Sequence, residues 1–494
     1  MNHKLITDRL FYQKVLSIML PVALQQTINM GVNMLDTMML GQMGEVQISA
    51  SSLANQYYNF FTIFCMGIIG GSSVLAAQYW GARDLNKVQQ TFCLAIRMAL
   101  LFSVTFALLT WLFPAQIMRI YTPDPAVIEQ GIRYLRITTF VFVIHGTSLV
   151  AEQLMRSVGQ ARLGLVVSSI SFVVNLIANY IFIFGKFGAP RMEIAGAALG
   201  TLFARIAEFL VTFGYIFFRD RSLHFRFSHL FRKVERSLLM NYLRLGVPVL
   251  VSDGLLGLGS NIVSIILGHM GAAVVAANAI CQVIDRLFTV VIQGIANASS
   301  IVTGHTIGEG DTERAMQQGY TFYLLSVAFG LIAVVMVLAC GPLTIRVYSL
   351  TEETVIITEQ MMRAYTVIVF FQCIQSVMTK GVLRGGGDTK FLMKADILFM
   401  WLVSIPLGCI GGLVLGWPAW LTILCLRIDY VIKSAWCVTR LKSGKWIRSV
   451  EDASLPVRNR KYSDCKKGMY LWNIVFMEMT SFSASRKEKR SSPA

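Results

Sequence analysis

Asp36 is the residue whose setting most clearly predicts chemistry. It lies in the apolar stretch VNMLDTMMLG, and no Lys or Arg stands within four residues of it. A charged side chain inside a bilayer costs about 2.5–3.5 kcal/mol on insertion scales, so an isolated carboxylate there binds a proton or recruits a cation. We predict that Asp36 is an ion-coupling residue loaded by H⁺ or, transiently, by Na⁺. The alternative is a structural carboxylate bonded to a neighbouring helix.

Asn175 and Asn179, in VVNLIANYIFIFG, are placed to assist such a carboxylate. Residues four apart share one face of a helix, so both amides can join a hydrogen-bond network with Asp36. Polar contact between two helices is the alternative. Pro21 stands fifteen residues before Asp36. A proline removes one helical hydrogen bond, and we predict a helix kink there.

Asp253 and Asp285 are candidates for a second ion or substrate site. Asp253 lies in VPVLVSDGLLG without a nearby cation, whereas Asp285 is followed directly by Arg286. Adjacent side chains on a helix point about 100° apart, so each of these two can seek a different partner. An ion pair between Asp253 and Arg286 is the alternative, and it would make Asp253 structural.

Other charged residues in apolar stretches are given structural roles. Arg205 and Glu208 have the spacing of a salt bridge within one helix, and a lone His145 is expected to contact a neighbouring helix. Lys380 and Arg384 stand near the end of an apolar stretch, where long side chains can reach the lipid–water interface.

The elements that carry these residues are predicted from composition and apolar runs. Of the 494 residues, 55% are hydrophobic and only 14% charged, and the mean hydropathy is +0.60. Too little charge is present to solvate a water-soluble surface, and runs long enough to span a bilayer recur. We predict an all-α integral membrane protein with twelve transmembrane helices at 15–41, 47–77, 91–113, 126–155, 163–185, 193–218, 239–268, 274–303, 316–341, 354–383, 391–413 and 415–441.

An internal repeat relates the two halves of the chain. A shift of 227 places Pro21 on Pro248, and GQMG at 41–44 on GHMG at 268–271. A shift of 228 places LMRSVG on VLRGGG. Six helices per half return the chain to its starting side, so we predict two pseudo-symmetric six-helix bundles around a central cavity. The predicted boundaries are 1–218 and 239–445 for the bundles, 219–238 for a cytoplasmic linker on the membrane surface, and 446–494 for a basic, disordered cytoplasmic tail.

Charge sets the predicted orientation. The net charge is +17, and Lys and Arg gather in alternate connections, above all in 219–236 and in the tail. The positive-inside rule then places both termini in the cytoplasm. We predict that the chain lies in the plasma or inner membrane of the cell. Because this charge is explained by topology, nucleic acid is not expected as a partner.

Several classes of function are not supported by the sequence. It has no GxxxxGK[ST], HExxH or GxSxG motif, and eight of its nine cysteines fall in apolar segments without a CxxC pair. We expect no enzyme activity, no bound metal and no cofactor apart from H⁺ or Na⁺ as a coupling ion. An intramembrane enzyme would need a clustered nucleophile and base, and none is found.

The motifs together resemble the multidrug and toxic compound extrusion family. They are LDTMMLG around Asp36, GGSSVLAAQYWGARD, NLIANYIFIFG and KGVLRGGGDTK, and the resemblance covers about 15–445. It implies an antiporter of cationic or amphipathic drugs, with Asp36 as the family's first-helix carboxylate, Asn175 as its fifth-helix asparagine and Pro21 as its kink proline. Asn179 departs from the family, because many members carry Asp there.

The resemblance does not extend to the C-terminal sodium site of one subgroup. Asp253 lies about one turn before the position of that subgroup's glutamate. Where the subgroup has a second acid, this chain has only Gln372, Gln375 and Lys380.

Two transport functions remain open. The first is secondary active antiport of small amphipathic or cationic molecules by alternating access, by a monomer in the lipid bilayer. The alternative is a lipid-linked oligosaccharide flippase of the same superfamily, whose anionic substrate would need mid-membrane cations such as Arg97, Arg205, Arg286 and Arg427.

Overall fold

Long apolar helices make up the computed structural model, which describes residues 5–220, 222–347 and 351–449. Eleven of its helical stretches are long and apolar enough to cross a membrane. The twelfth predicted segment is split at Arg427 into α14 (Ala419–Leu426) and α15 (Ile428–Lys442), so neither piece reaches that length alone. The all-α class with eleven to twelve apolar helices is therefore confirmed.

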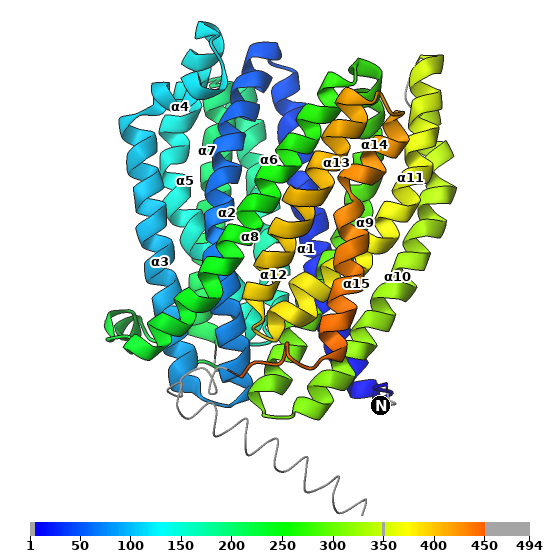
Figure 1. Cartoon of the computed structure of the whole chain (residues 1–494). Helices are drawn as coiled ribbons and strands as arrows, with labels where there is room; N and C mark the ends of the chain where they lie inside the picture. The colour runs from blue at the N-terminus through cyan, green and yellow to red at the C-terminus, as the bar shows by residue number, and fades with distance from the viewer. Residues whose placement is uncertain (1–4, 221, 348–350, 450–494) are drawn as a thin grey trace, which may run out of the picture. The chain divides into compact units, whose positions relative to one another are not determined.

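The N-terminal half holds seven α-helices (Figure 1). Their bounds are α1 Arg9–Gly41, α2 Glu45–Gly81, α3 Leu85–Leu112, α4 Pro114–Tyr121, α5 Pro125–Ser157, α6 Ala161–Phe184 and α7 Ile194–Gly214, which continues into the π-helical turn η1 Tyr215–Arg219. The short helix α4 was not predicted, because it lies in a connection and spans no membrane. A 3₁₀ turn, η2 Phe227–Phe231, lies between this half and the next.

The C-terminal half follows the same plan with more irregular helices. Its bounds are α8 Arg236–His269, α9 Ala272–Gly308, α10 Thr312–Val347, α11 Glu352–Ser376 with the π-helical η3 Val377–Leu383, and α12 Thr389–Asp396 with η4 Ile397–Ser404, α13 Ile405–Cys409 and η5 Ile410–Val414, followed by α14 and α15. The π-helical turns insert extra residues into continuous helices, and such turns often occur at functional sites.

Helix starts obey the predicted repeat. A shift of 227 relates the first residues of α2 and α9, of α3 and α10, and of α5 and α11, and a shift of 228 relates those of α6 and α12. Gly44 and Gly271, which precede α2 and α9, have φ angles of +124° and +116°. An L side chain rarely adopts this backbone, so the repeat preserves glycine at both turns.

Several helices extend past the predicted apolar spans. Helix α1 begins at Arg9 because the Asp8 side chain accepts a hydrogen bond from the Leu10 amide, and the Asp84 side chain caps α3 in the same way by accepting from the Lys87 amide. Such caps satisfy backbone N–H groups that helix ends leave open. Apolar runs alone therefore place these boundaries too far inward.

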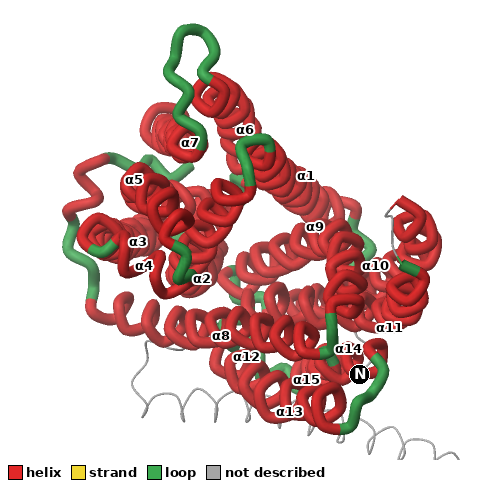
Figure 2. The backbone as a smooth tube through the Cα atoms, turned by 90° about the horizontal axis from the view of Figure 1, so that it is seen from above, coloured by secondary structure: helices red, strands yellow, loops and turns green. Residues whose placement is uncertain are grey.

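The two halves meet mainly through α2 with α8 and α9, and through α1 with α9 (Figure 2). We name the end that carries the chain's N-terminus and the connections 82–84, 158–160, 309–311 and 385–388 the basic end; it is at the bottom of Figure 1. The predicted bundle boundaries near 218 and 239 stay a prediction.

Close backbone contacts seal the halves at the basic end. A Cβ atom on Gly81 would lie 2.0 Å from the His305 carbonyl oxygen, and one on Gly308 would lie 1.9 Å from that of Gln78. The His305 ring nitrogen Nε2 is 2.7 Å from the Ser157 carbonyl oxygen. Farther from this end, a Cβ on Gly257 would contact only the terminal methyl group of Ile63, at 3.2 Å. The backbones of the two halves therefore lie farther apart there than at the basic end.

The connection between α7 and α8 packs on α3. The Gln89 amide donates to the Leu223 carbonyl at 2.7 Å, and the Arg97 guanidinium donates to the carbonyls of Leu230 and Arg232. Trp446, which the prediction assigns to the tail, is fully buried and packs against Gly386. The rest of the predicted tail, 450–494, lies outside the described residues.

Candidate functional site

Asp36, Asn175 and Asn179 are brought together in the N-terminal half. Asn179 Nδ2 donates to Asp36 Oδ1 at 2.5 Å and lies 3.2 Å from Asn175 Oδ1. Asp36 comes from α1 and is half-buried, while the two α6 amides are 1% and 4% exposed for Asn179 and Asn175. The arrangement matches the predicted contact, whereas the coupling role of these residues stays a prediction.

The environment of Asn179 leaves one acceptor unused. Its Oδ1 is buried and has no hydrogen-bond partner among the described residues. Gly200 of α7 faces this oxygen so closely that a Cβ there would lie 1.9 Å away. The close approach of Gly200 encloses the Asn179 oxygen, while the nitrogen of the same amide is bound to Asp36.

A second polar network lies on α5 and α7. Glu208 accepts from Arg205 Nη1 at 2.6 Å, and its other oxygen is 3.0 Å from His145 Nδ1 and from Ser148 Oγ. The predicted Arg205–Glu208 salt bridge is confirmed, and His145 binds a neighbouring helix as expected.

Asp253 pairs with Arg384 and not with Arg286. Arg384 Nη2 lies 3.0 Å from Asp253 Oδ1. The expectation that Lys380 and Arg384 reach the lipid interface is wrong, because both line a cavity between the two halves. Gly381 and Gly385 explain the difference, because a Cβ on either would collide with Ser299 or Ser300 of α9. This close packing on α9 holds the segment that carries Lys380 and Arg384 at the cavity.

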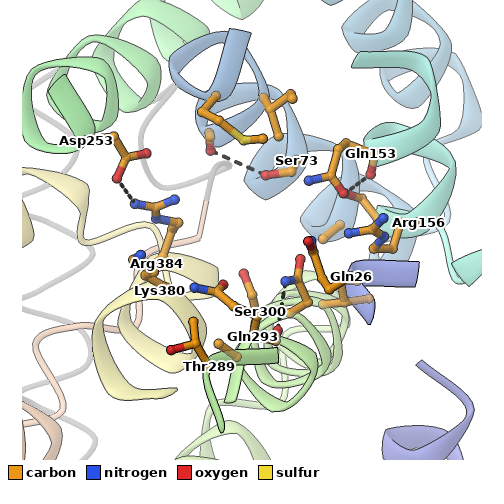
Figure 3. Close-up of a pocket in the computed structure, with 18 of the residues that line it drawn as sticks. Gln26, Ser73, Gln153, Arg156, Asp253, Thr289, Gln293, Ser300, Lys380 and Arg384 are labelled. Atoms are coloured by element: carbon orange, nitrogen blue, oxygen red, sulfur yellow. Dashed lines mark hydrogen bonds and ion pairs between the residues drawn. The ribbon is translucent and has the colours of Figure 1, made fainter. Parts of the chain in front are cut away.

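The cavity has a volume of about 530 Å³ and lies between α1, α2 and α5 on one side and α8, α9 and η3 with the following Arg384 on the other. Figure 3 shows Arg156, Gln26 and Gln153 facing Asp253, Arg384 and Lys380 across it. Two of its lining residues, Ala77 and Ser157, adjoin the contacts between the halves at the basic end. The cavity therefore opens away from the basic end.

Asp285 lies in a different cavity from Asp253. This smaller space of about 170 Å³ belongs to the C-terminal half. Its lining is polar and aromatic, with Ser260, Gln282, Arg286, Tyr365, Ile368, Gln372, Arg427 and Tyr430 around Asp285. The two acids that the sequence suggested as one second site are thus placed in two.

Sequence comparison decides the family of this fold. A model of the MatE family matches residues 21–181 and 248–410, one match in each half. The chain belongs to the MatE family. Its resemblance to multidrug and toxic compound extrusion transporters is thereby confirmed, and the two MatE matches begin at the repeat-related Pro21 and Pro248.

Named relatives of this MatE chain include two multidrug resistance proteins. The chain is 24% identical over 406 residues to MdtK of Photorhabdus laumondii, covering 81% of this chain and 88% of that protein. It is 24% identical over 411 residues to NorM of Vibrio cholerae, covering 81% and 87%. A crystal structure of MATE in the bent conformation has the same fold, with a TM-score of 0.79 at 18% identity over 88% of this chain and 96% of that one.

Two buried ionic groups in this MatE fold were missed by the sequence analysis. Arg156 Nη2 contacts Glu152 Oε1 at 2.9 Å and Gln25 Oε1 at 2.6 Å. In the C-terminal half, the fully buried Lys433 lies 2.8 Å from Asp396 and 2.9 Å from Asp429. The i,i+4 spacings Glu152–Arg156 and Asp429–Lys433 within apolar stretches were the available signal.

Within residues 5–220, 222–347 and 351–449, no three His, Cys, Asp or Glu side chains gather closely enough to hold a metal ion. No disulfide joins the eight cysteines that the structure describes.

Proposed function

We propose that this chain is a secondary active antiporter that exports small cationic or amphipathic molecules in exchange for H⁺ or Na⁺. Membership of the MatE family and the multidrug resistance names of its relatives support drug export. They give no support to the flippase alternative. The single observation that carries the coupling scheme is the contact of Asp36 with Asn179.

The proposed cycle follows from the charge of Asp36. As a carboxylate, Asp36 accepts from Asn179 Nδ2; loading by H⁺ or Na⁺ removes the negative charge that this donor stabilises. The α1–α6 contact then weakens, and Pro21 gives α1 a place to bend. Tight exchange requires that ion and drug oppose each other's binding.

The basic end is proposed to face the cytoplasm, following the positive-inside rule. The structure then corresponds to an outward-facing state, because its central cavity is closed at that end. Both termini are cytoplasmic in this proposal, and the monomer is the transporting unit in the cell membrane.

Ethidium uptake into everted vesicles tests the coupling. We expect uptake under an imposed proton or sodium gradient by the native chain, and its loss in Asp36→Asn. Glu129→Gln is the matched control, because Glu129 is an exposed acid whose side chain is 64% accessible. Full ion-driven uptake by Asp36→Asn overturns the proposal.

A further inference from the structure

The residues that line the floor of the central cavity include more cations than acids. Three cations line it, Arg156, Lys380 and Arg384, against a single lining acid, Asp253. The remaining polar lining is uncharged, with amides such as Gln293 and hydroxyls such as Ser300. A charge inside a membrane protein marks a substrate path or is paired with another, so each of the three cations must be accounted for.

Two of the cations have fixed partners. Arg156 is bound to Glu152, which lies behind it and is 4% exposed, and to Gln25. Arg384 is bound to Asp253 at 3.0 Å. Each of these guanidinium groups is thus matched by one carboxylate.

Lys380 has no such partner. Among the described residues, no hydrogen bond or ion pair reaches its ammonium group, and its side chain is half-buried at the cavity wall. Two acids attract its charge, Asp253 and Asp396, but Asp253 is bound to Arg384 and Asp396 is bound to Lys433. Thr289 and Gln293 of α9 share the wall with Lys380 and are neutral (Figure 3).

Packing keeps Lys380 away from lipid. Gly381 follows it directly, and a Cβ there would lie 2.0 Å from Ser299 Oγ and 3.0 Å from the Ala296 carbonyl oxygen. The backbone at this point is π-helical (η3) and pressed against α9. The ammonium therefore stays at the cavity and cannot extend to the lipid–water interface.

We propose that Lys380 binds the anionic group of an amphipathic substrate, such as a carboxylate or sulfonate, at the floor of the central cavity. The apolar body of that substrate would lie against Ile63, Met66, Ile69, Leu256 and Val290, which line the same space. A cavity of about 530 Å³ has the size of small-molecule sites. The proposal rests on the proposed export function and assigns anionic or zwitterionic amphipaths to its substrates.

Binding of dansylglycine tests this assignment against its neutral amide, dansylglycinamide. The full chain is placed in phosphatidylcholine nanodiscs, and dansyl fluorescence is titrated without an ion gradient. We expect Lys380→Met to weaken dansylglycine binding at least tenfold and to change dansylglycinamide binding less than twofold. Lys380→Arg, which keeps the charge, should bind dansylglycine within about threefold of the native chain.

Controls separate this site from folding, lipid and coupling. Lys390→Met removes an exposed lysine ten residues away and should leave dansylglycine binding unchanged. Equal affinity of Lys380→Met and the native chain for dansylglycine overturns the proposal. The proposal is also overturned if dansylglycine no longer binds when phosphatidylglycerol replaces phosphatidylcholine in the nanodiscs, because the anion bound by Lys380 would then be a lipid headgroup. Asp36→Asn should still bind dansylglycine, so failure of the coupling scheme is distinguishable from failure of this site.

Discussion

Asn179 Nδ2 donates to Asp36 Oδ1 at 2.5 Å, joining α6 to α1 across 143 positions of sequence. The amide is almost fully buried, and its own oxygen has no partner among the described residues. A donor held this way stabilises the negative form of Asp36, so the affinity of Asp36 for H⁺ or Na⁺ depends on an uncharged neighbour.

Replacing Asn179 by leucine is expected to reduce ion-driven ethidium uptake about tenfold or more. A hydrogen bond to a charged group contributes about 1.5–3 kcal/mol, and its loss alters the balance between loaded and empty Asp36. The measurement is initial uptake in everted vesicles at matched protein content. Gln116→Leu on α4 removes an exposed amide and should leave uptake unchanged. Unaltered uptake by Asn179→Leu would contradict the role given to this amide.

Gly200→Ala is expected to disturb the same site from α7. Its Cβ would lie 1.9 Å from Asn179 Oδ1, so Asn179 must move away from Asp36. Gly214→Ala is the matched control on the same helix, because nothing lies within 4 Å of its Cβ. We expect at least a fivefold loss of uptake for Gly200→Ala and no loss for Gly214→Ala. Alanine favours a helix over glycine by about 1 kcal/mol, so helix propensity alone would not cause a loss. Equal activity of the two variants would show that Asn179 has room to adjust.

Gly308→Ala is expected to open the basic end. The added Cβ would lie 1.9 Å from the Gln78 carbonyl oxygen, a backbone atom that cannot rotate away. Spin labels at the repeat-related exposed positions Asn86 and Glu313 report the separation of the halves there. We expect a longer mean label distance in Gly308→Ala than in the parent. Gly268→Ala, which meets no atom within 4 Å, should keep the parent distribution, and an identical distribution in Gly308→Ala would rule out this seal.

The sequence predicts helices well because lipid requires long apolar runs and closed backbone hydrogen bonding. It also predicts the repeat, since Gly44 and Gly271 mark the same turn in each half. It could not predict the break at Arg427, because the residues on both sides of Arg427 are helical and no Pro or Gly marks the interruption.

The rotation of each helix about its axis was harder to predict. Apolar side chains face both lipid and protein, so an apolar run does not tell which face Lys380 takes. The placement of Lys380 depends on Gly381 and Gly385 packing on α9, a contact between segments about 80 positions apart. The Asp36–Asn179 contact could be anticipated because two unpaired polar groups in apolar helices each need a partner.

The pair Glu152–Arg156 and the pair Glu129–Arg133 offer a direct comparison of buried and exposed ion pairs. Both have i,i+4 spacing on α5, but the first pair is 5% exposed at each side chain and the second 64% and 59%. Breaking a buried pair leaves an uncompensated charge and costs about 3–5 kcal/mol, whereas an exposed pair contributes about 0–1 kcal/mol.

Glu152→Gln is therefore expected to lower the thermal unfolding temperature of the detergent-solubilised chain clearly, and Glu129→Gln to leave it nearly unchanged. The double variant Glu152→Gln with Arg156→Met should unfold at a higher temperature than Glu152→Gln alone, because it removes the stranded cation. In that variant, both side chains that contact Gln25 of α1 are neutral. Helix α1 also contacts α9, which joins the two halves. Additive losses in the double variant would show that Glu152 and Arg156 contribute independently, and that the cavity floor does not depend on their pairing.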